Sequence, residues 1–182
     1  MGELGPLVVK IGGGLLQAEG LDGLRRGCAE VLELARDRPV LVVPGGGPFA
    51  DAVRDLDARV GLGDDVAHVL ALRAMDQLGV LLVPMLPGVE LLDRLIVPAS
   101  LGLLLVAPAF EGRPGVPESW DVTSDSLAVL AAGAIGADEA ILLKPVRGGG
   151  VDAYLPEAVC RTGVTVTIRV PGGRPGTRVT PR

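Results

Sequence analysis

Three glycine triplets, each placed after a short apolar run, are the feature of this sequence that most restricts its fold. Residues 7–11 lead into Gly12-Gly13-Gly14, residues 39–43 lead through one proline into Gly45-Gly46-Gly47, and residues 140–143 precede the third triplet. A helical pattern follows the first two triplets. Strand, glycine turn and helix in repeated order are typical of a parallel α/β sheet, which binds its ligands at the carboxyl ends of the strands.

Hydrophobic spacing predicts the other elements of a single α/β domain. The expected helices cover residues 15–36, 49–60, 64–78 and 126–135, and the further strands cover residues 103–106, 140–143 and 164–170. Residues 79–97 show no clear pattern, and the proline- and glycine-rich residues 108–118 and 171–182 are expected to form a loop and a tail. A chain of 182 residues with 48% apolar residues can bury a full core, so one domain over residues 1–182 is expected.

Lysine is rare in this chain, and its two positions are informative. Of the 17 lysine and arginine residues, only Lys10 and Lys144 are lysines, and each stands where an apolar run gives way to glycines. An ammonium is a compact point charge that suits a transferring phosphoryl group, whereas a guanidinium is a planar fork. Glycines next to it let backbone N–H groups approach phosphate oxygens closely. The two lysines and the glycines together predict a phosphoryl-transfer site.

The composition argues against several classes of partner. The net charge is −5, aromatic residues make up 2% and no basic block is present, so nucleic acid and anionic membrane surfaces are not expected partners. The apolar runs 78–89 and 95–110 are interrupted by prolines and are shorter than the roughly 20 residues of a spanning helix, so buried strands or an oligomer contact are expected. Two cysteines and no visible targeting segment indicate a reducing, cytoplasmic setting.

Four motifs, taken in chain order, resemble those of the amino acid kinase family. They are Val8-Val9-Lys10-Ile11-Gly12-Gly13, the second glycine triplet, Ser124-Asp125-x-x-Ala128 at a helix start, and the strand that ends in Lys144. The resemblance covers most of residues 5–160. It implies a three-layer αβα sandwich around an open, mainly parallel sheet, with ATP as the phosphoryl donor and Mg²⁺ as its cofactor. It also implies that Lys10 and Lys144 stabilise the transferring phosphoryl group while Asp125 holds the two ammonium groups in position.

The same resemblance implies a set of phosphate- or nucleotide-binding residues. These are Gly12, Gly13, Gly14, Gly45, Gly46, Gly47, Thr123, Gly148 and Gly149. After Lys144 the chain departs from the Thr-Asp-Val-Asp-Gly pattern that relatives commonly carry, and reads Pro145-Val146-Arg147-Gly148-Gly149-Gly150-Val151-Asp152. The nucleotide side of the domain is therefore expected to be shortened.

A narrower resemblance, to the kinases of methanofuran biosynthesis, concerns the acceptor. It is carried by Phe49-Ala50-Asp51-x-Val53-Arg54, Asp65-x-x-His68, Ala74-Met75-Asp76-Gln77 and Ser119-Trp120-Asp121-Val122-Thr123. It implies that (5-(aminomethyl)furan-3-yl)methyl phosphate is converted to its diphosphate. A phosphate acceptor is already ionised near neutral pH and needs no catalytic base. Asp51, Asp55 and Asp65 are candidates for the substrate ammonium, and Arg54 and His68 are candidates for its phosphate.

Other interpretations stay open at this point. The acceptor within the same family could be a carboxylate, carbamate, uridylate or isopentenyl phosphate. A different class, a non-catalytic protein that binds nucleotides or oxyanions on the same fold, is the main rival. The apolar runs suggest a homo-oligomer, with a hetero-oligomer as the alternative.

Overall fold

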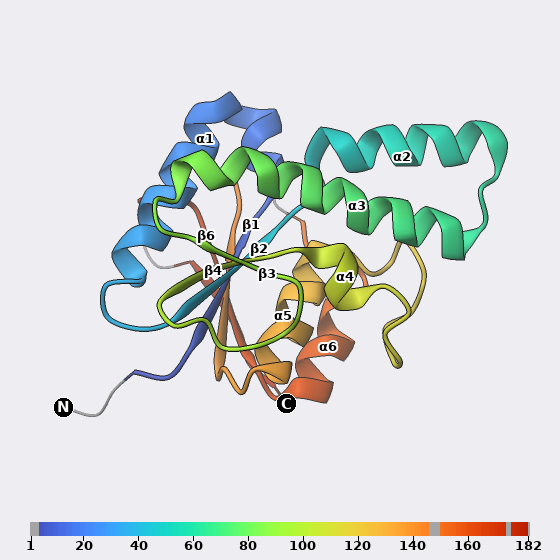
Figure 1. Ribbon diagram of the computed structural model, residues 1–182. Coiled ribbons are helices and arrows are strands. Elements are labelled where there is room, and N and C mark those ends of the chain that lie inside the picture. The colour runs from blue at the N-terminus through green and yellow to red at the C-terminus, as the bar shows by residue number, and fades with distance from the viewer. Residues whose placement is uncertain (1–3, 146–149, 174–175, 182) are drawn as a thin grey trace.

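A seven-stranded sheet forms the centre of the protein in the computed structural model, which describes residues 4–145, 150–173 and 176–181 (Figure 1). The strand order is β3-β4-β2-β1-β5-β6-β7. All neighbouring strands are parallel except β6 and β7, which are antiparallel. The strands are β1 (Leu7–Ile11), β2 (Val40–Pro44), β3 (Glu90–Leu92), β4 (Leu101–Leu104), β5 (Glu139–Leu143), β6 (Thr165–Arg169) and β7 (Thr177–Val179).

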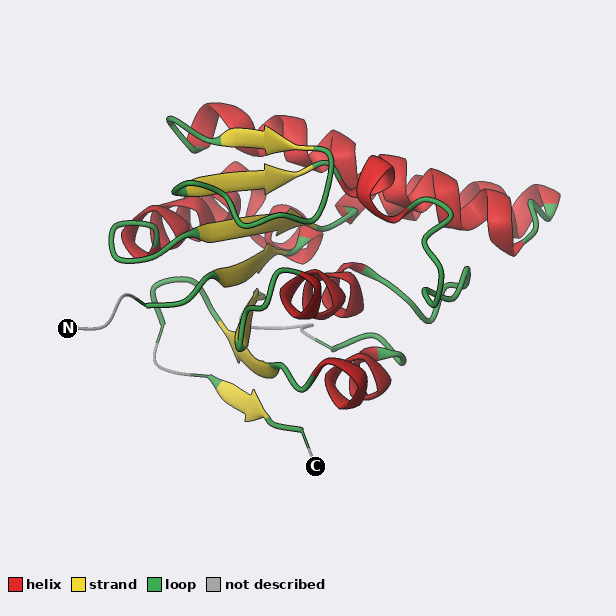
Figure 2. Cartoon of the chain, turned by 60° about the horizontal axis from the view of Figure 1, so that its bottom comes forward, coloured by secondary structure: helices red, strands yellow, loops and turns green. Residues whose placement is uncertain are grey.

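Helices cover both faces of this sheet, as Figure 2 shows. They are α1 (Gly13–Leu34), α2 (Gly47–Val60), α3 (Asp64–Leu82), the 3₁₀ turn η1 (Val83–Met85), α4 (Val106–Phe110), α5 (Ser124–Ala134) and α6 (Leu155–Thr162). Side chains alternate between the two faces of a strand. In β1, Val9 packs with α1 and the end of α3, whereas Val8 packs with α4, α5 and α6. The expected three-layer αβα sandwich with a mainly parallel sheet is confirmed.

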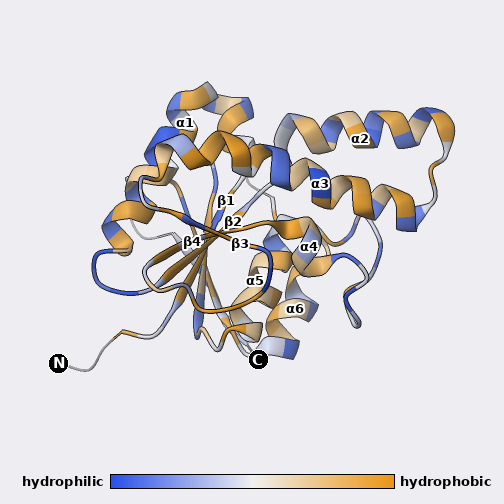
Figure 3. Cartoon of the chain, viewed as in Figure 1, coloured by the Kyte–Doolittle hydropathy of each residue, from blue (hydrophilic) through white to orange (hydrophobic). Residues whose placement is uncertain are grey.

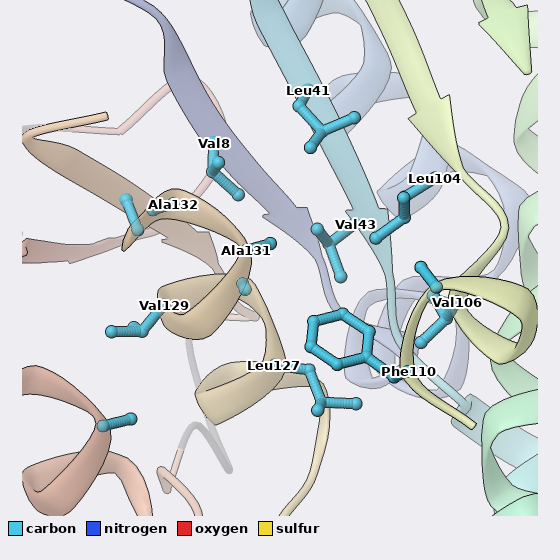
Figure 4. Close-up of a cluster of buried hydrophobic side chains, with 14 of the residues drawn as sticks. Val8, Leu41, Val43, Leu104, Val106, Phe110, Leu127, Val129, Ala131 and Ala132 are labelled. Atoms are coloured by element: carbon cyan, nitrogen blue, oxygen red, sulfur yellow. The ribbon is translucent and has the colours of Figure 1, made fainter. Parts of the chain in front are cut away.

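Phe110 anchors the hydrophobic core on the α4–α6 face. Figure 4 shows its ring beside Val43 of β2, Leu127 of α5 and Val106 of α4. Phe110 is 1% exposed and belongs to a cluster that extends from β4 to α6. A chain with so few aromatic residues fills this space mainly with alanine, valine and leucine, so the helices approach the sheet closely.

Helix α3 is unusually apolar, as its colouring in Figure 3 shows. Within the described residues, the segment Asp64–Met85 is the one helix with the length and mean hydropathy, 1.6, of a membrane span. Half of that window is buried inside the protein, where α3 packs on α2, α4 and the sheet. Burial in the core accounts for the buried half of this window.

Most of the predicted helices and strands agree with the structure to within about two residues, and the differences concern short elements. The strand predicted at residues 103–106 is shifted by two residues, and the predicted loop 108–118 begins with the short helix α4. Helix α6 and the strands β3 and β7 were not expected. Helix α6 has only eight residues, and β7 is a three-residue edge strand within a segment rich in proline and glycine. Such short elements carry too few residues for a periodic signal.

Candidate active site

Lys10 and Lys144 lie at the same edge of the sheet and on the same face. Lys10 belongs to β1 and Lys144 follows the last residue of β5, its parallel neighbour. Lys10 comes two residues after Val8, and Lys144 two residues after Leu142, and these two apolar residues both face α5. Because strand side chains repeat every two residues, both ammonium groups also point toward the α5 layer.

Asp125 lies between the two lysines and pairs with both. Its Oδ1 is 2.8 Å from Lys10 Nζ and its Oδ2 is 2.5 Å from Lys144 Nζ. Asp125 stands in the first turn of α5, and all three side chains are nearly buried, with 3%, 6% and 7% of Asp125, Lys10 and Lys144 exposed. Burial alone would raise the pKa of Asp125, but the charges and hydrogen bonds of the two lysines outweigh it and lower that pKa. These three groups by themselves carry one more positive than negative charge.

The ammonium of Lys144 is less basic than that of an ordinary lysine. Burial, followed by the charge of Lys10, lowers the pKa of Lys144, and the carboxylates of Asp125 and Asp152 oppose this effect. Lys144 Nζ also donates to the carbonyl of Gly150, which fixes its position. A buried ammonium held in this way can face a phosphoryl group without reorganising during the reaction.

The first two glycine triplets pack directly against each other. A Cβ atom on Gly13 would lie 2.1 Å from the Cα of Gly47, and Gly47 itself has a positive φ of 54°. A Cβ on Gly12 would lie 2.6 Å from Lys10 Nζ, so Gly12 leaves room for the ammonium. The glycines are therefore required for packing between the loops as well as for access to a ligand.

The six glycines of these loops divide into two groups by the use of their N–H groups. Gly12 donates to Leu143 and Gly45 donates to Ile11, so these two N–H groups are used within the sheet edge. The other four glycines, Gly13, Gly14, Gly46 and Gly47, line a cavity of about 310 Å³ at the carboxyl ends of the strands. They stand at the amino ends of α1 and α2, where helical N–H groups have no partner within the helix.

This cavity brings together most of the predicted site. It is lined by Lys10, Lys144, Asp125, Thr123, Asp51 and Arg54, in addition to the four glycines. A second cavity, of about 630 Å³, is lined mainly by residues 4–6 and 35–39. It contains neither lysine, so the smaller cavity is the candidate active site.

One end of the candidate site is formed by α2 and Trp120. Arg54 lies over the Trp120 ring, with its Cζ 4.6 Å from the ring centroid, and also pairs with Asp51 at 3.3 Å. Trp120 Nε1 donates to Asp57 at 2.9 Å, and this bond, together with that from Leu62 N, lowers the pKa of Asp57. Gln17 of α1 donates to Asp51 as well. A carboxylate, a guanidinium and an indole ring therefore border the same end of the cavity.

The amino end of α5 is occupied by a carboxylate from another part of the chain. Asp152 Oδ2 accepts hydrogen bonds from Thr123 N at 2.9 Å, Thr123 Oγ1 at 2.8 Å and Ser126 N at 3.0 Å. Its Oδ1 accepts a further bond from Ser126 Oγ. Thr123, which was predicted to bind phosphate, lines the cavity but directs both of its donors to Asp152.

Among the predicted site residues that the structure describes, Gly12, Gly45 and His68 do not line the cavity. His68 is 5% exposed, does not line the cavity, and has a pKa lowered by burial, an effect that Glu118 opposes. A buried, neutral imidazole is poorly suited to a phosphate. Gly148 and Gly149 lie outside the described residues. Among the residues that the structure describes, no cluster of three or more His, Cys, Asp or Glu side chains could hold a metal ion.

The sequence-based interpretation missed several cavity residues. Gln17, Met75, Val122 and Asp152 line the cavity, and Asp57 orients Trp120 from outside it. Asp57 was detectable, since it follows Arg54 by three residues and so lies on the same helical face. Asp152 could have been noticed as an acidic residue two positions after the third glycine triplet.

With this geometry established, the comparison with protein families is direct: the chain belongs to the amino acid kinase family, whose model matches residues 5–148. Among curated proteins, it is 27% identical over 148 residues to the [5-(aminomethyl)furan-3-yl]methyl phosphate kinase of Methanocaldococcus jannaschii. The match covers 78% of this chain and 66% of that protein, slightly less than two thirds of its length.

Solved structures with the same fold are more distant in sequence. The uridylate kinase from Archaeoglobus fulgidus has a TM-score of 0.65 and 16% identity, with 90% of each chain covered. The UMP kinase from Ureaplasma parvum has a TM-score of 0.71 and 14% identity, with 95% of this chain and 92% of that chain covered. At such identities the likeness shows the fold, which agrees with the sheet order and layers described above.

Proposed function

We propose that this chain is a small-molecule kinase that transfers the γ-phosphoryl group of ATP to a phosphate acceptor. The observation that carries the proposal is the pair of buried lysines held by one carboxylate, Lys10–Asp125–Lys144, in a cavity bordered by open helix ends. We propose (5-(aminomethyl)furan-3-yl)methyl phosphate as the acceptor, and its diphosphate as the product. The similarity to the Methanocaldococcus jannaschii kinase supports this choice.

The reaction joins an oxygen of the acceptor phosphate to the γ-phosphorus of ATP. The bond between that phosphorus and the β,γ-bridging oxygen breaks, and ADP leaves with the bonding electrons. The acceptor oxygen is ionised near neutral pH, so no side chain has to remove a proton. The protein has to place two anions in line and stabilise the charge on the phosphoryl oxygens.

In this proposal the two lysines act on the phosphoryl group and Asp125 acts on the lysines. Lys10 and Lys144 donate to phosphoryl oxygens, and Asp125, paired with both, keeps their Nζ atoms at fixed positions. The N–H groups of Gly13, Gly14, Gly46 and Gly47 supply further donors at the ends of α1 and α2. Each such donor is typically worth about 10²–10³ in turnover.

The end of the cavity beside Trp120 is the proposed acceptor site. Asp51 is about half exposed, with 47% of its side chain accessible, and can pair with an ammonium on the acceptor. Arg54 carries the complementary charge for the acceptor phosphate, and Met75, Val122 and Trp120 supply apolar surface for a small ring. A furan that bears an aminomethyl group and a phosphate carries all three of these chemical features.

The residues present fit a triphosphate better than they fit a bare metal ion. Both oxygens of Asp125 face ammonium groups, and the described residues contain no cluster of three metal-ligating side chains. We therefore propose that Mg²⁺ is held chiefly by the phosphates of ATP, as is common for this ion, where it neutralises phosphate charge. We also propose that the segment after Lys144, which includes Gly148 and Gly149, contributes to nucleotide binding.

An ADP-release assay across a set of acceptors tests the proposal. We expect the highest kcat/KM with the furan phosphate, lower values with its analogue that lacks the aminomethyl group, and none with the corresponding alcohol. UMP, isopentenyl phosphate, carbamate and aspartate serve as rival acceptors. ADP release with a carboxylate but with no phosphate would contradict the proposed acceptor, and ATP binding without ADP release for any acceptor would favour a non-catalytic binding protein.

We further propose that copies of the chain associate through the apolar surface around edge strand β3. The exposed side chains there are Val80, Val83, Leu91, Ile96 and Val97. An edge strand with apolar neighbours is a common site of self-association. Size-exclusion chromatography with light scattering is expected to show a dimer or larger species, and a Leu91→Lys variant is expected to shift it toward the monomer.

A further inference from the structure

We propose that Asp152 is a positioning residue that fixes the amino end of α5 and thereby holds Asp125 between the two lysines. The inference rests on the phosphoryl-transfer site proposed above. It concerns a residue to which neither the motifs nor the comparisons assign a role.

Asp152 makes hydrogen bonds to residues on both sides of Asp125 in the sequence. Asp152 accepts from Thr123, two residues before Asp125, and from Ser126, the residue after it. Ser126 is fully buried, so its hydroxyl and N–H have no access to solvent as an alternative partner. With the residues on both sides of it held, the backbone of Asp125 is held as well, and its carboxylate reaches both lysines.

Asp152 also connects α5 to the chain that follows Lys144. Lys144 Nζ donates to the carbonyl of Gly150, two residues before Asp152. Tyr154 N, two residues after Asp152, donates to the carbonyl of Asp121 at 3.1 Å. The segment 150–154 is therefore attached to Lys144 at one end and to the loop before α5 at the other. A displacement of Asp152 changes the position of both partners of the Lys144–Asp125 ion pair.

The carboxylate of Asp152 has an electrostatic effect in addition to its hydrogen bonds. Among the described residues, the charged groups that face Lys144 are Lys10 from β1, Asp125 from α5 and Asp152 from the segment before α6. The two carboxylates raise the pKa of Lys144 against the effects of burial and Lys10. Loss of the Asp152 charge is therefore expected to lower the pKa of Lys144 further, which a purely structural residue would not do.

The Asp152→Asn variant, with Asp138→Asn as its matched control, tests the inference. Asp138 is exposed and precedes β5, at the opposite edge of the sheet. Since the chain has only two lysines, ¹³C-labelled lysine gives two side-chain signals, which a Lys10→Arg variant assigns. In Asp152→Asn we expect a lower pKa of Lys144 and amide exchange at Ser126 at least about 10-fold faster, with no change in Asp138→Asn.

Turnover supplies the second readout. In Asp152→Asn we expect kcat to fall about 10- to 100-fold while the KM of the acceptor changes little, because the lysines and not the acceptor site are displaced. Ser126→Ala, which removes one of the four bonds and keeps the charge, is expected to fold and to show a smaller fall in kcat. An unchanged Lys144 pKa and Ser126 exchange in Asp152→Asn would overturn the inference. These two measurements need no acceptor, so they remain decisive if the furan phosphate proves to be the wrong substrate.

Discussion

The amino ends of α1 and α2 differ from the amino end of α5, although all three border one cavity. At α1 and α2 the cap residues are Gly12 and Gly46, the first helical residue is a glycine, and no side chain among the described residues caps either helix. At α5 the sequence is polar, and the carboxylate of Asp152 accepts hydrogen bonds from the N–H groups of Thr123 and Ser126. The first two helix ends are thus open to an anion from outside, whereas the third is filled by the protein itself.

This difference separates two tasks that a helix end can perform. An open end offers unpaired N–H groups and positive potential to a phosphate. At the end of α5, the Ser126 N–H is directed to Asp152 instead, and this bond gives a fixed attachment for the neighbouring residue, Asp125. Asp76 of α3 accepts from Val106 and Ala107 at the start of α4 in the same way. In the proposed function, the glycines at the open ends contact the phosphates, and the carboxylates position the residues around them.

Removal of Lys10, which lies between the open and the filled ends, is expected to have the largest effect. Lys10→Ala should lower turnover by about 10³-fold or more with little change in melting temperature, since it removes charge stabilisation that no other group replaces. Lys10→Arg should also lose most of its activity, because a planar guanidinium does not replace a compact ammonium against the phosphoryl group. Arg25→Ala, at an exposed position on α1, is the control, and steady-state kinetics is the measurement. Near-normal turnover in Lys10→Ala would end the proposed mechanism.

Closing an open end with a methyl group should have the next largest effect. In Gly13→Ala the new Cβ would lie 2.1 Å from Gly47 Cα and 2.2 Å from Gly47 N, so the two loops must separate. Such overpacking typically costs about 1–3 kcal/mol of stability. Calorimetry is expected to show ATP affinity reduced at least about 10-fold. Gly5→Ala, where no atom lies within 4 Å of the new Cβ, should leave binding unchanged. Equal affinity in both variants would show that the loops are not the phosphate site.

The pH dependence of turnover should report the Lys144 ammonium at the filled end. Its pKa is lowered by burial and by Lys10, so it loses its proton below the ordinary lysine value of 10.5. The protonated form is the one that stabilises phosphate, and turnover should therefore fall as pH rises through the lowered pKa. In Lys144→Arg the residual activity should lack this alkaline limb, because a guanidinium stays charged. If the unchanged protein and Lys144→Arg lost turnover over the same alkaline pH range, another group would be responsible for the titration.

The smallest effect is expected at the acceptor end, away from α5. Trp120→Phe keeps an aromatic ring beside Arg54 but loses the hydrogen bond to Asp57, which is typically worth about 0.5–1.5 kcal/mol. The KM of the acceptor should rise by about 2- to 10-fold while kcat stays near that of the unchanged protein. Leu56→Ala, an exposed position on α2, is the control. A fall in kcat at constant KM would place Trp120 with the phosphoryl group instead.

The sequence by itself determined the central sheet and the charges at its edge. Strand and helix periods located β1, β2, β5, α2 and α5 to within about two residues, because each has a long enough apolar pattern. The same period of two in β1 and β5 directs Lys10 and Lys144 to one face. Their rarity in an arginine-rich chain marked them as special before any fold was known.

Only the tertiary structure decided which groups complete the site. The contact of Gly13 with Gly47, the bond of Trp120 to Asp57 and the bonds of Asp152 to Thr123 and Ser126 join residues 26 or more positions apart. Local patterns give the direction of a side chain within its element, but they do not give the position of one element against another. That position follows from the packing of α1, α2 and α5 on the sheet, and it makes two helix ends open and the third filled.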